Sequence, residues 1–239
     1  MGDVAAFSCI CEEDAWLLDQ YLTEVERLDI PFGMHMDRCS AETKLRIENH
    51  PLCFGTTVQD DPKREYTEQD KQAIFDMLYK SGRRRRWALH WDVDEIWDKD
   101  APDKLRAIIN RSEDLLYVKW VNCWGDLEHI RVDTVFASSR RVKLYNISQG
   151  RRWLFDHPIT YGCKMVGDEG LVKHGAGVHA DLDLVCLHTG LMTRELREFH
   201  KARWDRILTT AVGNNPLGFW EYCVREADFP PTVIPNPYR

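Results

Sequence analysis

Hydrophobic positions in the first half of the chain follow two alternating periodicities. Short apolar runs, typical of buried strands, are separated by longer segments in which apolar residues recur every three or four positions, as on one face of a helix. The predicted strands are residues 3–10, 31–36, 53–58, 87–93 and 115–121. The predicted helices are residues 14–28, with Asp14 as the N-cap, 41–48, 67–79 and 103–111. This alternation predicts an α/β fold with a mostly parallel central sheet flanked by helices.

The pattern is less regular after residue 122. Short β-like pieces occur at residues 134–137 and 142–145, and a buried strand is predicted at 184–187. Helices are predicted at residues 193–212 and 219–226. The last eleven residues, FPPTVIPNPYR, contain four prolines, which predicts an extended tail. Because no internal repeat or low-complexity linker interrupts the 239 residues, we predict a single domain.

The stretch WALHWDVDEIWD, from Trp87 to Asp98, places four acidic residues in a hydrophobic run. Burying an uncompensated carboxylate is costly. Asp92 and Asp94 are two positions apart, so on an extended strand their side chains point the same way. They also lie at the carboxyl end of a predicted parallel strand, where open α/β sheets bind ligands. We therefore predict a divalent cation between them, since hard cations prefer oxygen ligands; the alternative is a solvated strand end.

The remaining acidic residues of this stretch have less specific interpretations. Glu95 is expected to help orient the cluster, and Asp98 is expected to cap the next helix. The first three predicted strands also end in polar residues, in the segments SCICE (residues 8–12), DRCSAE (37–42) and QDD (59–61).

Taken in order, these segments resemble the nucleotide-sugar-dependent glycosyltransferases of the GT-A fold, particularly those of family 2. That family typically carries D-x-x-S-x-D after the second strand, which this chain matches as DRCSAE with Glu42 as the last acidic residue. It carries D-x-D-E after the fourth strand, matched here by residues 92–95. Many members later have a histidine, a glycine and a basic helix, as in CLHTGLMTRELREFHKARW, residues 186–204. The resemblance extends from residue 4 to about residue 206.

The resemblance implies one GT-A-like domain with a nucleotide-sugar-binding half (1–121), an acceptor-binding half (122–226) and a Pro-rich tail (227–239). It implies Mn²⁺ or Mg²⁺ bound by Asp92, Asp94 and His188, which would stabilise the diphosphate leaving group as a Lewis acid. The implied donor-binding residues are Ser8, Cys9, Glu12, Asp37, Asp60 and Asp92. The alternatives are a core histidine at position 188 and solvated loop residues at positions 37 and 60.

An inverting transfer needs a general base beside the acceptor hydroxyl. We predict Asp126 as that base, because it follows a strand containing Trp120 and Trp124, whose rings would stack on a sugar. Other candidates are Glu128, Asp133 and the pair at 168–169. Because the usual E-D pair before an acceptor helix is missing, both the base and the inverting outcome stay open.

Basic and aromatic residues are mixed in the predicted acceptor half. This mixture suits a polyanionic acceptor such as DNA, or an anionic glycan. The acceptor-binding candidates are Trp124, Arg141, Arg152 and Trp153. The run at residues 83–86 follows a predicted helix, where cations interact well with the helix dipole, and is interpreted as a solvated structural feature. His174 and His179 are candidates for a diphosphate-binding loop, and a zinc site combining them with His188 is not expected, because the spacings match no standard motif.

The predicted function is transfer of a sugar from a nucleotide-diphosphate sugar to a glycan or to a hydroxymethylated base of viral DNA. The alternatives are a metal-dependent nucleotide-sugar phosphohydrolase and a non-catalytic nucleotide-sugar-binding protein. A net charge of -7 argues against a surface built throughout for nucleic acid. We expect a cytoplasmic protein, since no secretory signal or transmembrane segment is recognised and the eight scattered cysteines suit reduced thiols. The oligomeric state stays open.

Overall fold

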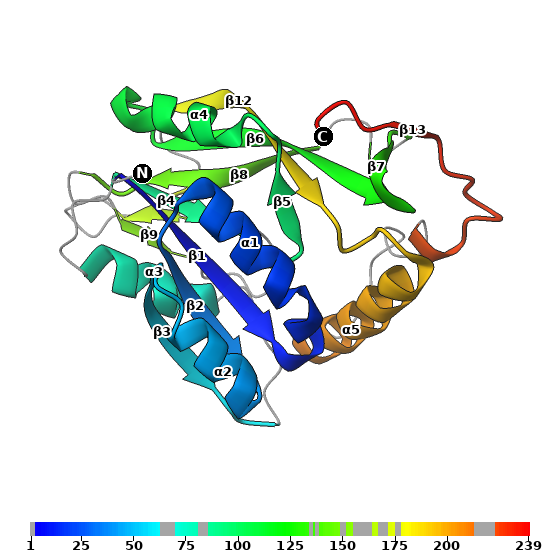
Figure 1. The fold of residues 1–239 in the computed structure, drawn as a ribbon, viewed down its shortest axis with the longest axis horizontal. Helices are drawn as coiled ribbons and strands as arrows, with labels where there is room; N and C mark the ends of the chain where they lie inside the picture. Colours follow the sequence, from blue (N-terminus) through cyan, green and yellow to red (C-terminus); the bar gives the residue numbers. More distant parts are fainter. Residues whose placement is uncertain are drawn as a thin grey trace. The chain divides into compact units, whose positions relative to one another are not determined.

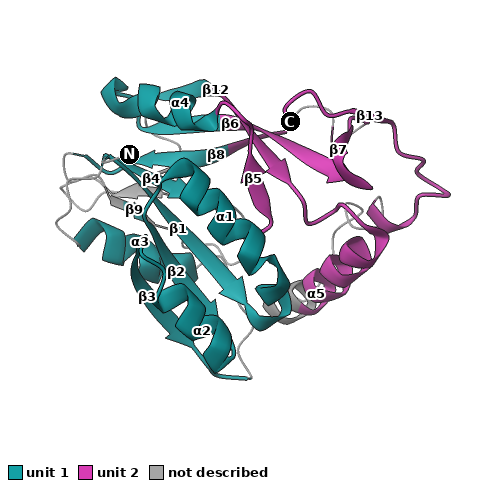
Figure 2. Ribbon diagram, viewed as in Figure 1, with its two compact units in different colours: residues 1–93, 101–117, 142–182 teal, residues 94–100, 118–141, 183–239 magenta. Residues whose placement is uncertain are grey.

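The computed structural model describes residues 3–62, 70–80, 86–133, 136, 139–148, 152–154, 164–166, 172–174, 178–212 and 223–239. Figure 2 shows two compact units. Unit 1 comprises residues 1–93, 101–117 and 142–182, and unit 2 comprises residues 94–100, 118–141 and 183–239. Each unit takes segments from both sides of residue 121.

Unit 1 contains a mixed sheet with the strand order β8-β4-β1-β2-β3 (Figure 1). These strands are β1 (Val4–Cys11), β2 (Phe32–Asp37), β3 (Cys53–Gln59), β4 (Trp87–His90) and β8 (Ser139–Asn146). The four strands from the first part of the chain are parallel to one another, and β8 is antiparallel to β4. Every residue of β1 is buried, as expected for a strand inside a sheet that is covered on both faces. The predicted α/β class with a mostly parallel sheet is confirmed.

Helices cover both faces of this sheet. The helical segments are η1 (Glu12–Leu17), α1 (Leu18–Leu28), α2 (Ala41–Glu48), α3 (Lys71–Lys80), α4 (Ala101–Ala107) and η3 (Ile108–Asn110). Ser8 shares a hydrogen bond with Tyr21 of α1, and the next residue back along β1, Phe7, packs on Phe75 of α3. Because successive side chains of a strand point to opposite faces, α1 and α3 pack on opposite sides of β1.

Local sequence signals explain where several helices begin and end. Helix α2 has the predicted bounds, and the side chain of Ser40 caps it by accepting a hydrogen bond from the Thr43 backbone N–H. The prediction that Asp14 is an N-cap is wrong. The chain enters the 3₁₀ turn η1 already at Glu12, and the buried Asp14 carboxylate accepts a hydrogen bond from Cys11 Sγ.

Unit 2 contains a hairpin and a second antiparallel pair. Strand β6 (Leu115–Trp124), whose first residues belong to unit 1, pairs with β7 (Asp126–Arg131) through a turn at Gly125, which has a positive φ of 85°. The C-terminal strand β13 (Val233–Pro235) pairs with β7, and β5 (Glu95–Trp97) pairs with β12 (His179–His188). Helix α5 spans Arg194–Val212. One core cluster of this unit comprises Ile96, Val121, Cys123, Ile130, Val185 and Leu187.

Several sequence predictions need correction in detail. The strand predicted at residues 87–93 ends at His90, and the chain then turns before β5. The predicted strand at 184–187 is the buried end of the longer β12. The helix predicted at 103–111 is divided into α4 and η3. The proline-rich tail is extended, as predicted, and its β13 adds to the edge of β7. Of the predicted segments 134–137 and 219–226, only residue 136 and residues 223–226 are described.

Two further observations complete the fold. In unit 1, β9 (Arg152–Leu154), β10 (Lys164–Val166) and β11 (Val172–His174) form a small antiparallel sheet. Within the described part of the chain, no helix has the length and apolar character that crossing a bilayer requires.

Candidate functional site

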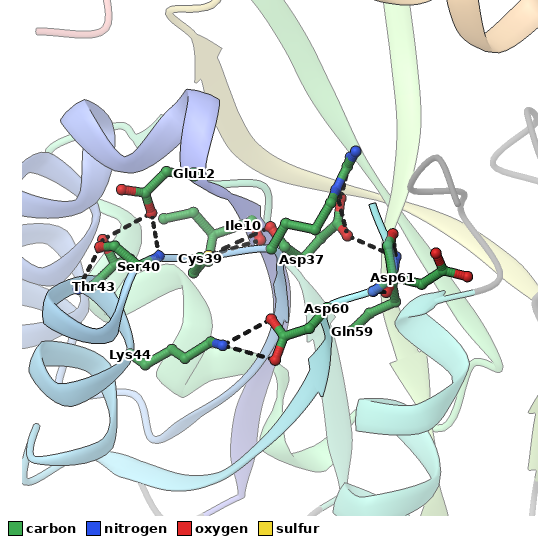
Figure 3. Close-up of polar contacts among 11 residues, drawn as sticks. Ile10, Glu12, Asp37, Cys39, Ser40, Thr43, Lys44, Gln59, Asp60 and Asp61 are labelled. Atoms are coloured by element: carbon green, nitrogen blue, oxygen red, sulfur yellow. Dashed lines mark hydrogen bonds and ion pairs between the residues drawn. The ribbon is translucent and has the colours of Figure 1, made fainter. Parts of the chain in front are cut away.

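Glu12 holds the start of α2 in unit 1. Its carboxylate accepts hydrogen bonds from the Ser40 backbone N–H at 2.7 Å and from Thr43 Oγ1 at 3.1 Å (Figure 3). The hydrogen bond from the Ser40 backbone is the main reason that the pKa of Glu12 lies below its usual value. This predicted donor-binding residue therefore ties the end of β1 to the N-terminus of α2.

Asp37 ends β2 and Asp60 follows β3, but the two residues have different surroundings. The Asp37 side chain is only 1% exposed and accepts hydrogen bonds from Arg38 Nη2 at 2.7 Å and Gln59 Nε2 at 3.0 Å. Arg38 adopts a left-handed φ of 53°, which costs a non-glycine residue about 1–2 kcal/mol. Asp60 is exposed, and its carboxylate forms an ion pair with Lys44 at 2.8 Å (Figure 3). Both carboxylates lie at the carboxyl edge of the sheet, as predicted, and a role in donor binding stays a prediction.

Ser8 and Cys9 are buried within β1. The Ser8 hydroxyl is fully buried and lies 2.6 Å from the Tyr21 hydroxyl, with which it shares a hydrogen bond. Burial raises the pKa of Tyr21, so the phenol stays protonated. Ser8 belongs to the packing between β1 and α1, and its role in donor binding stays a prediction.

Asp92 lies between two buried ammonium groups in unit 1. Its Oδ1 accepts a hydrogen bond from Lys71 Nζ at 2.8 Å, and its Oδ2 accepts one from Lys143 Nζ at 3.1 Å. The lysine side chains are 2% and 0% exposed, whereas that of Asp92 is 22% exposed. Burial alone would raise the pKa of Asp92, but Lys143 and Lys71 hold it well below its usual range. A divalent ion at Asp92 would face these two ammonium groups, so the cluster does not fit the predicted metal-ligand role.

His90 completes this cluster, with Nε2 located 3.2 Å from Asp92 Oδ1. Burial, together with the charge of Lys71, lowers the pKa of His90 to about 4. The imidazole is therefore neutral near pH 7, and its ring stacks on Phe7 with the centroids 5.2 Å apart.

Asp94 and His188 form a separate pair in unit 2. Asp94 Oδ2 lies 2.9 Å from His188 Nε2, and Asn122 Oδ1 lies 2.8 Å from His188 Nδ1. The backbone N–H and the hydroxyl of Thr189 both donate to the Asp94 carbonyl oxygen at 2.8 Å. Trp120 stacks against the imidazole with the ring centroids 4.4 Å apart. Strand β12, the turn after β4 and strand β6 thus fix this pair.

The partner of His188 Nδ1 determines what Nε2 can do. An amide oxygen is an acceptor, so Nδ1 carries a hydrogen in this arrangement. Nε2 then faces a carboxylate oxygen, and that contact is favourable only when a proton or a metal cation is shared between the two atoms. A neutral imidazole whose other nitrogen donates to a fixed acceptor is the usual state of a metal-binding histidine.

Gly190 leaves space beside this pair. A Cβ at position 190 would lie 2.4 Å from Asp94 Oδ2, 2.9 Å from His188 Nε2 and 3.1 Å from His200 Nε2. His200 comes from α5 and is 8% exposed. The described parts of the chain contain no group of three or more His, Cys, Asp and Glu side chains that could hold a metal ion. The Asp94 carboxylate and the His188 imidazole are nevertheless suitable donors for a divalent cation. Gly190 has no side chain, so nothing at this position separates the two groups.

Glu95 and Asp98 are compensated by protein groups. The buried Glu95 carboxylate accepts a hydrogen bond from Trp120 Nε1 at 3.0 Å and so helps to position the ring that stacks on His188. Asp98 accepts hydrogen bonds from the Val185 backbone N–H at 2.7 Å and the Asp100 backbone N–H at 3.0 Å. Asp98 therefore joins β5 to β12. This contact was not part of the prediction that Asp98 caps the next helix.

Two predicted acceptor residues are part of the packing. The Trp124 ring is buried in unit 2, and the Cζ atoms of Arg131 and Arg197 lie 4.5 Å and 4.0 Å from its centroid. Trp153 is buried in the core of unit 1, where its Nε1 donates to the Asn146 carbonyl oxygen at 3.0 Å. Both rings are buried, and their role in acceptor binding stays a prediction.

The other acceptor-half predictions remain untested. Asp126 is exposed and accepts hydrogen bonds from the Glu128 backbone N–H and His129 Nδ1, each at 2.8 Å. The bond from His129 is the main reason that the pKa of Asp126 is lowered. The guanidinium of Arg141 lies 3.9 Å from the ring centroid of Trp120. The side chains of Arg152 and His174, and residues 83–85 and 168–169, lie outside the described part of the structure.

In sequence, the chain matches no known protein family and no curated protein. Among solved structures, a protein assigned as a glucose-1-phosphate thymidylyltransferase from Bacillus anthracis, in complex with sucrose, is similar over 60% of this chain and 71% of its own, with 10% identity and a TM-score of 0.39. A glycosyltransferase involved in glycosylation of the major capsid of PBCV-1 is similar over 61% and 60%, with 11% identity and a TM-score of 0.33. HddC from Yersinia pseudotuberculosis is similar over 86% and 100%, with 8% identity and a TM-score of 0.40. All three TM-scores lie below 0.5, and the function of this chain is therefore inferred from its own residues.

Proposed function

We propose that this protein is a glycosyltransferase that moves a sugar from a nucleotide-diphosphate sugar to a hydroxyl group with the help of a divalent cation. The observation that carries the proposal is the pairing of Asp94 with His188 beside Gly190. These residues belong to the two segments, D-x-D-E and His-x-Gly, that resemble the family 2 glycosyltransferases. Two segments that are distant in the sequence, and that each resemble a different motif of the family, are thus in direct contact within unit 2.

Asp94 and His188 would hold the cation, which is expected to be Mn²⁺ or Mg²⁺. When bound, a divalent ion supplies Lewis-acid stabilisation of the diphosphate that leaves as the glycosidic bond breaks. Asn122 keeps His188 Nε2 directed at Asp94, and Trp120 limits rotation of the imidazole. Groups of this kind typically change metal affinity or activity by about 10–100-fold when they are removed.

The acceptor is proposed only as a hydroxyl compound. Asp126 remains the proposed general base, and an inverting outcome remains part of the proposal. The prediction of a DNA acceptor depended on aromatic rings that are exposed among arginines. Trp124 and Trp153 are buried, so two of these rings do not support it. A phosphohydrolase would normally gather more carboxylates or histidines around its metals, and no ready cluster of three is present among the described residues.

The first test is thermal unfolding with UDP-, GDP-, CDP- and TDP-sugars, each with and without Mn²⁺. A ligand that binds only the folded state stabilises it by about 2.7 kcal/mol at a hundredfold excess over Kd. We expect one nucleotide to raise the melting temperature in a Mn²⁺-dependent way, and Asp94→Asn to abolish this shift. The matched control is Asp103→Asn, at an exposed position on α4.

Sugar transfer is then followed by mass spectrometry of candidate acceptors. If the wild-type protein shows no shift with any sugar nucleotide, with or without metal, the proposed function is wrong. If it shows a shift and hydrolyses the donor while every acceptor stays unmodified, the phosphohydrolase is the better assignment.

A further inference from the structure

We infer that Arg38, which directly follows β2 in unit 1, selects the base of the donor, and that this base is guanine. The inference deepens the proposed function and depends on its nucleotide-sugar donor, but it does not depend on the metal site. Asp37, rather than Arg38, is the position that the family resemblance implies for donor binding.

The Asp37 carboxylate is already occupied by protein groups. It is 1% exposed, and its two oxygens accept hydrogen bonds from Arg38 and Gln59. Glu12 and Asp60, at the same edge of the sheet, also have protein partners (Figure 3). A ligand N–H would have to displace one of these groups before it could reach Asp37. The Arg38 side chain, in contrast, is 32% exposed, so this end of β2 presents a hydrogen-bond donor to a ligand.

The Arg38 guanidinium is held in one orientation. Its Nε and Nη2 donate to the Asp37 carboxylate at 3.1 Å and 2.7 Å, and Gln59 Nε2 fixes the same carboxylate at 3.0 Å. The Arg38 backbone N–H donates to the Gln59 carbonyl oxygen at 2.6 Å. A planar guanidinium that is fixed along one edge loses little conformational entropy when its other edge binds a ligand.

The backbone of Arg38 is strained in a way that an ion pair with Asp37 does not require. Its φ of 53° lies in the left-handed region, which glycine adopts without strain and a residue with a Cβ does not. Strained backbone of this kind is concentrated at functional sites. Arg38 also lies at the carboxyl edge of a parallel sheet, where open α/β sheets bind their ligands.

The hydrogen-bonding pattern of the bases decides which nucleotide suits this side chain. A guanidinium carries five N–H donors and no acceptor. Guanine places two acceptors, O6 and N7, side by side on one edge, and an arginine donates to both at once. Uracil and thymine have one acceptor, O4, on the corresponding edge, and cytosine and adenine have an amino group there, which is a donor. Arg38 therefore matches guanine best, and the expected donor is a GDP-sugar.

The test is isothermal titration calorimetry of the full-length protein with GDP, UDP, CDP and ADP, each with and without Mn²⁺. We expect the wild type to bind GDP about tenfold more tightly than the other three nucleotides, a result that needs no variant. Arg38→Lys keeps a positive charge beside Asp37 but loses the planar pair of donors. This variant should bind GDP about 10–100-fold more weakly and should bind CDP with nearly unchanged affinity.

Arg46→Lys is the matched control, because Arg46 is an exposed arginine on α2 of the same unit and should leave all four affinities unchanged. Circular dichroism checks that each variant is folded. The ratio of the GDP and CDP affinities is the decisive quantity, since a general loss of structure would weaken both nucleotides together.

The possible outcomes separate this inference from the proposed function. An equal loss for all four nucleotides in Arg38→Lys would show that the guanidinium contacts the phosphates, and the assignment to the base would be wrong. A wild-type preference for another base, or unchanged GDP affinity in Arg38→Lys, would also overturn the inference while leaving the proposed function standing. If the wild type binds none of the nucleotides, with or without Mn²⁺, the proposed function fails together with this inference.

Discussion

Replacement of Asp92 by asparagine removes the carboxylate between Lys71 and Lys143. Two unit charges at 2.8 Å and 3.1 Å attract by about 5–6 kcal/mol per pair at an effective dielectric constant of about 20. Much of this attraction offsets the penalty for burying the ions. The variant loses the attraction and keeps the penalty for both lysines, and removal of one partner of a buried ion pair typically costs about 3–5 kcal/mol. We expect Asp92→Asn to lose about that much free energy of unfolding.

The assay is urea unfolding near neutral pH, followed by tryptophan fluorescence. Asp103→Asn is the control, because its carboxylate is exposed and pairs with Arg106 on the surface of α4, where such pairs contribute less than about 1 kcal/mol. The double variant Asp92→Asn/Lys143→Met removes one stranded ammonium and should recover part of the loss. An Asp92→Asn protein whose unfolding free energy stays within about 1 kcal/mol of the wild type would refute the assignment of Asp92 as the counter-ion of these lysines.

Three further predictions concern single side chains. The pKa of His90 is about 4 in the folded protein, so as pH falls the imidazole of the unfolded chain is protonated first, and up to about 3 kcal/mol of stability is lost between about pH 6.5 and 4. Urea titrations across this pH range should show a smaller loss of stability in His90→Gln than in the wild type. An equal loss in the two proteins contradicts the prediction. Arg131→Met leaves the Asp133 carboxylate without the guanidinium at 2.8 Å and should cost about 3–5 kcal/mol in urea unfolding, whereas the exposed Arg194→Met should cost at most about 0.5 kcal/mol. Asn122→Leu removes the acceptor of His188 Nδ1 and should weaken Mn²⁺ binding by about 10–100-fold in calorimetric titrations; wild-type affinity would show that the imidazole is held by other groups.

Periodicity predicted the elements whose signals are local. Strand β1 and helix α2 have nearly or fully the expected bounds, because one is a continuous apolar run and the other begins at a serine cap. Strands β5 and β7 were missed. Three-residue β5 is too short to show a period, and β7 shows no alternation, because its first four residues are mostly exposed and only its last two are buried. Such strands form by pairing with distant segments, which a local pattern does not encode.

The candidate site was predicted in part for the same reason. The contact between Asp94 and His188 joins residues that are far apart in sequence, and the family resemblance, rather than any local pattern, suggested it. The expectation that Asp92 and Asp94 point the same way assumed an extended strand through residue 93. The strand ends at His90, so alternation no longer relates the two carboxylates. Lys71 and Lys143 could not be anticipated, because each comes from a distant element.

The four acidic residues of WDVDEIWD show why a D-x-D motif alone does not define a metal site. Each carboxylate in this hydrophobic run requires compensation, and the chain supplies a different kind of group to each one. Ammonium groups neutralise Asp92, an indole N–H binds Glu95, and a backbone N–H of β12 binds Asp98. Asp94 differs because its partner is an imidazole nitrogen, a group that binds a proton or a metal ion with the same lone pair. We therefore propose that a cation binds at Asp94, where it can replace the contact with His188 without leaving a buried charge unpaired.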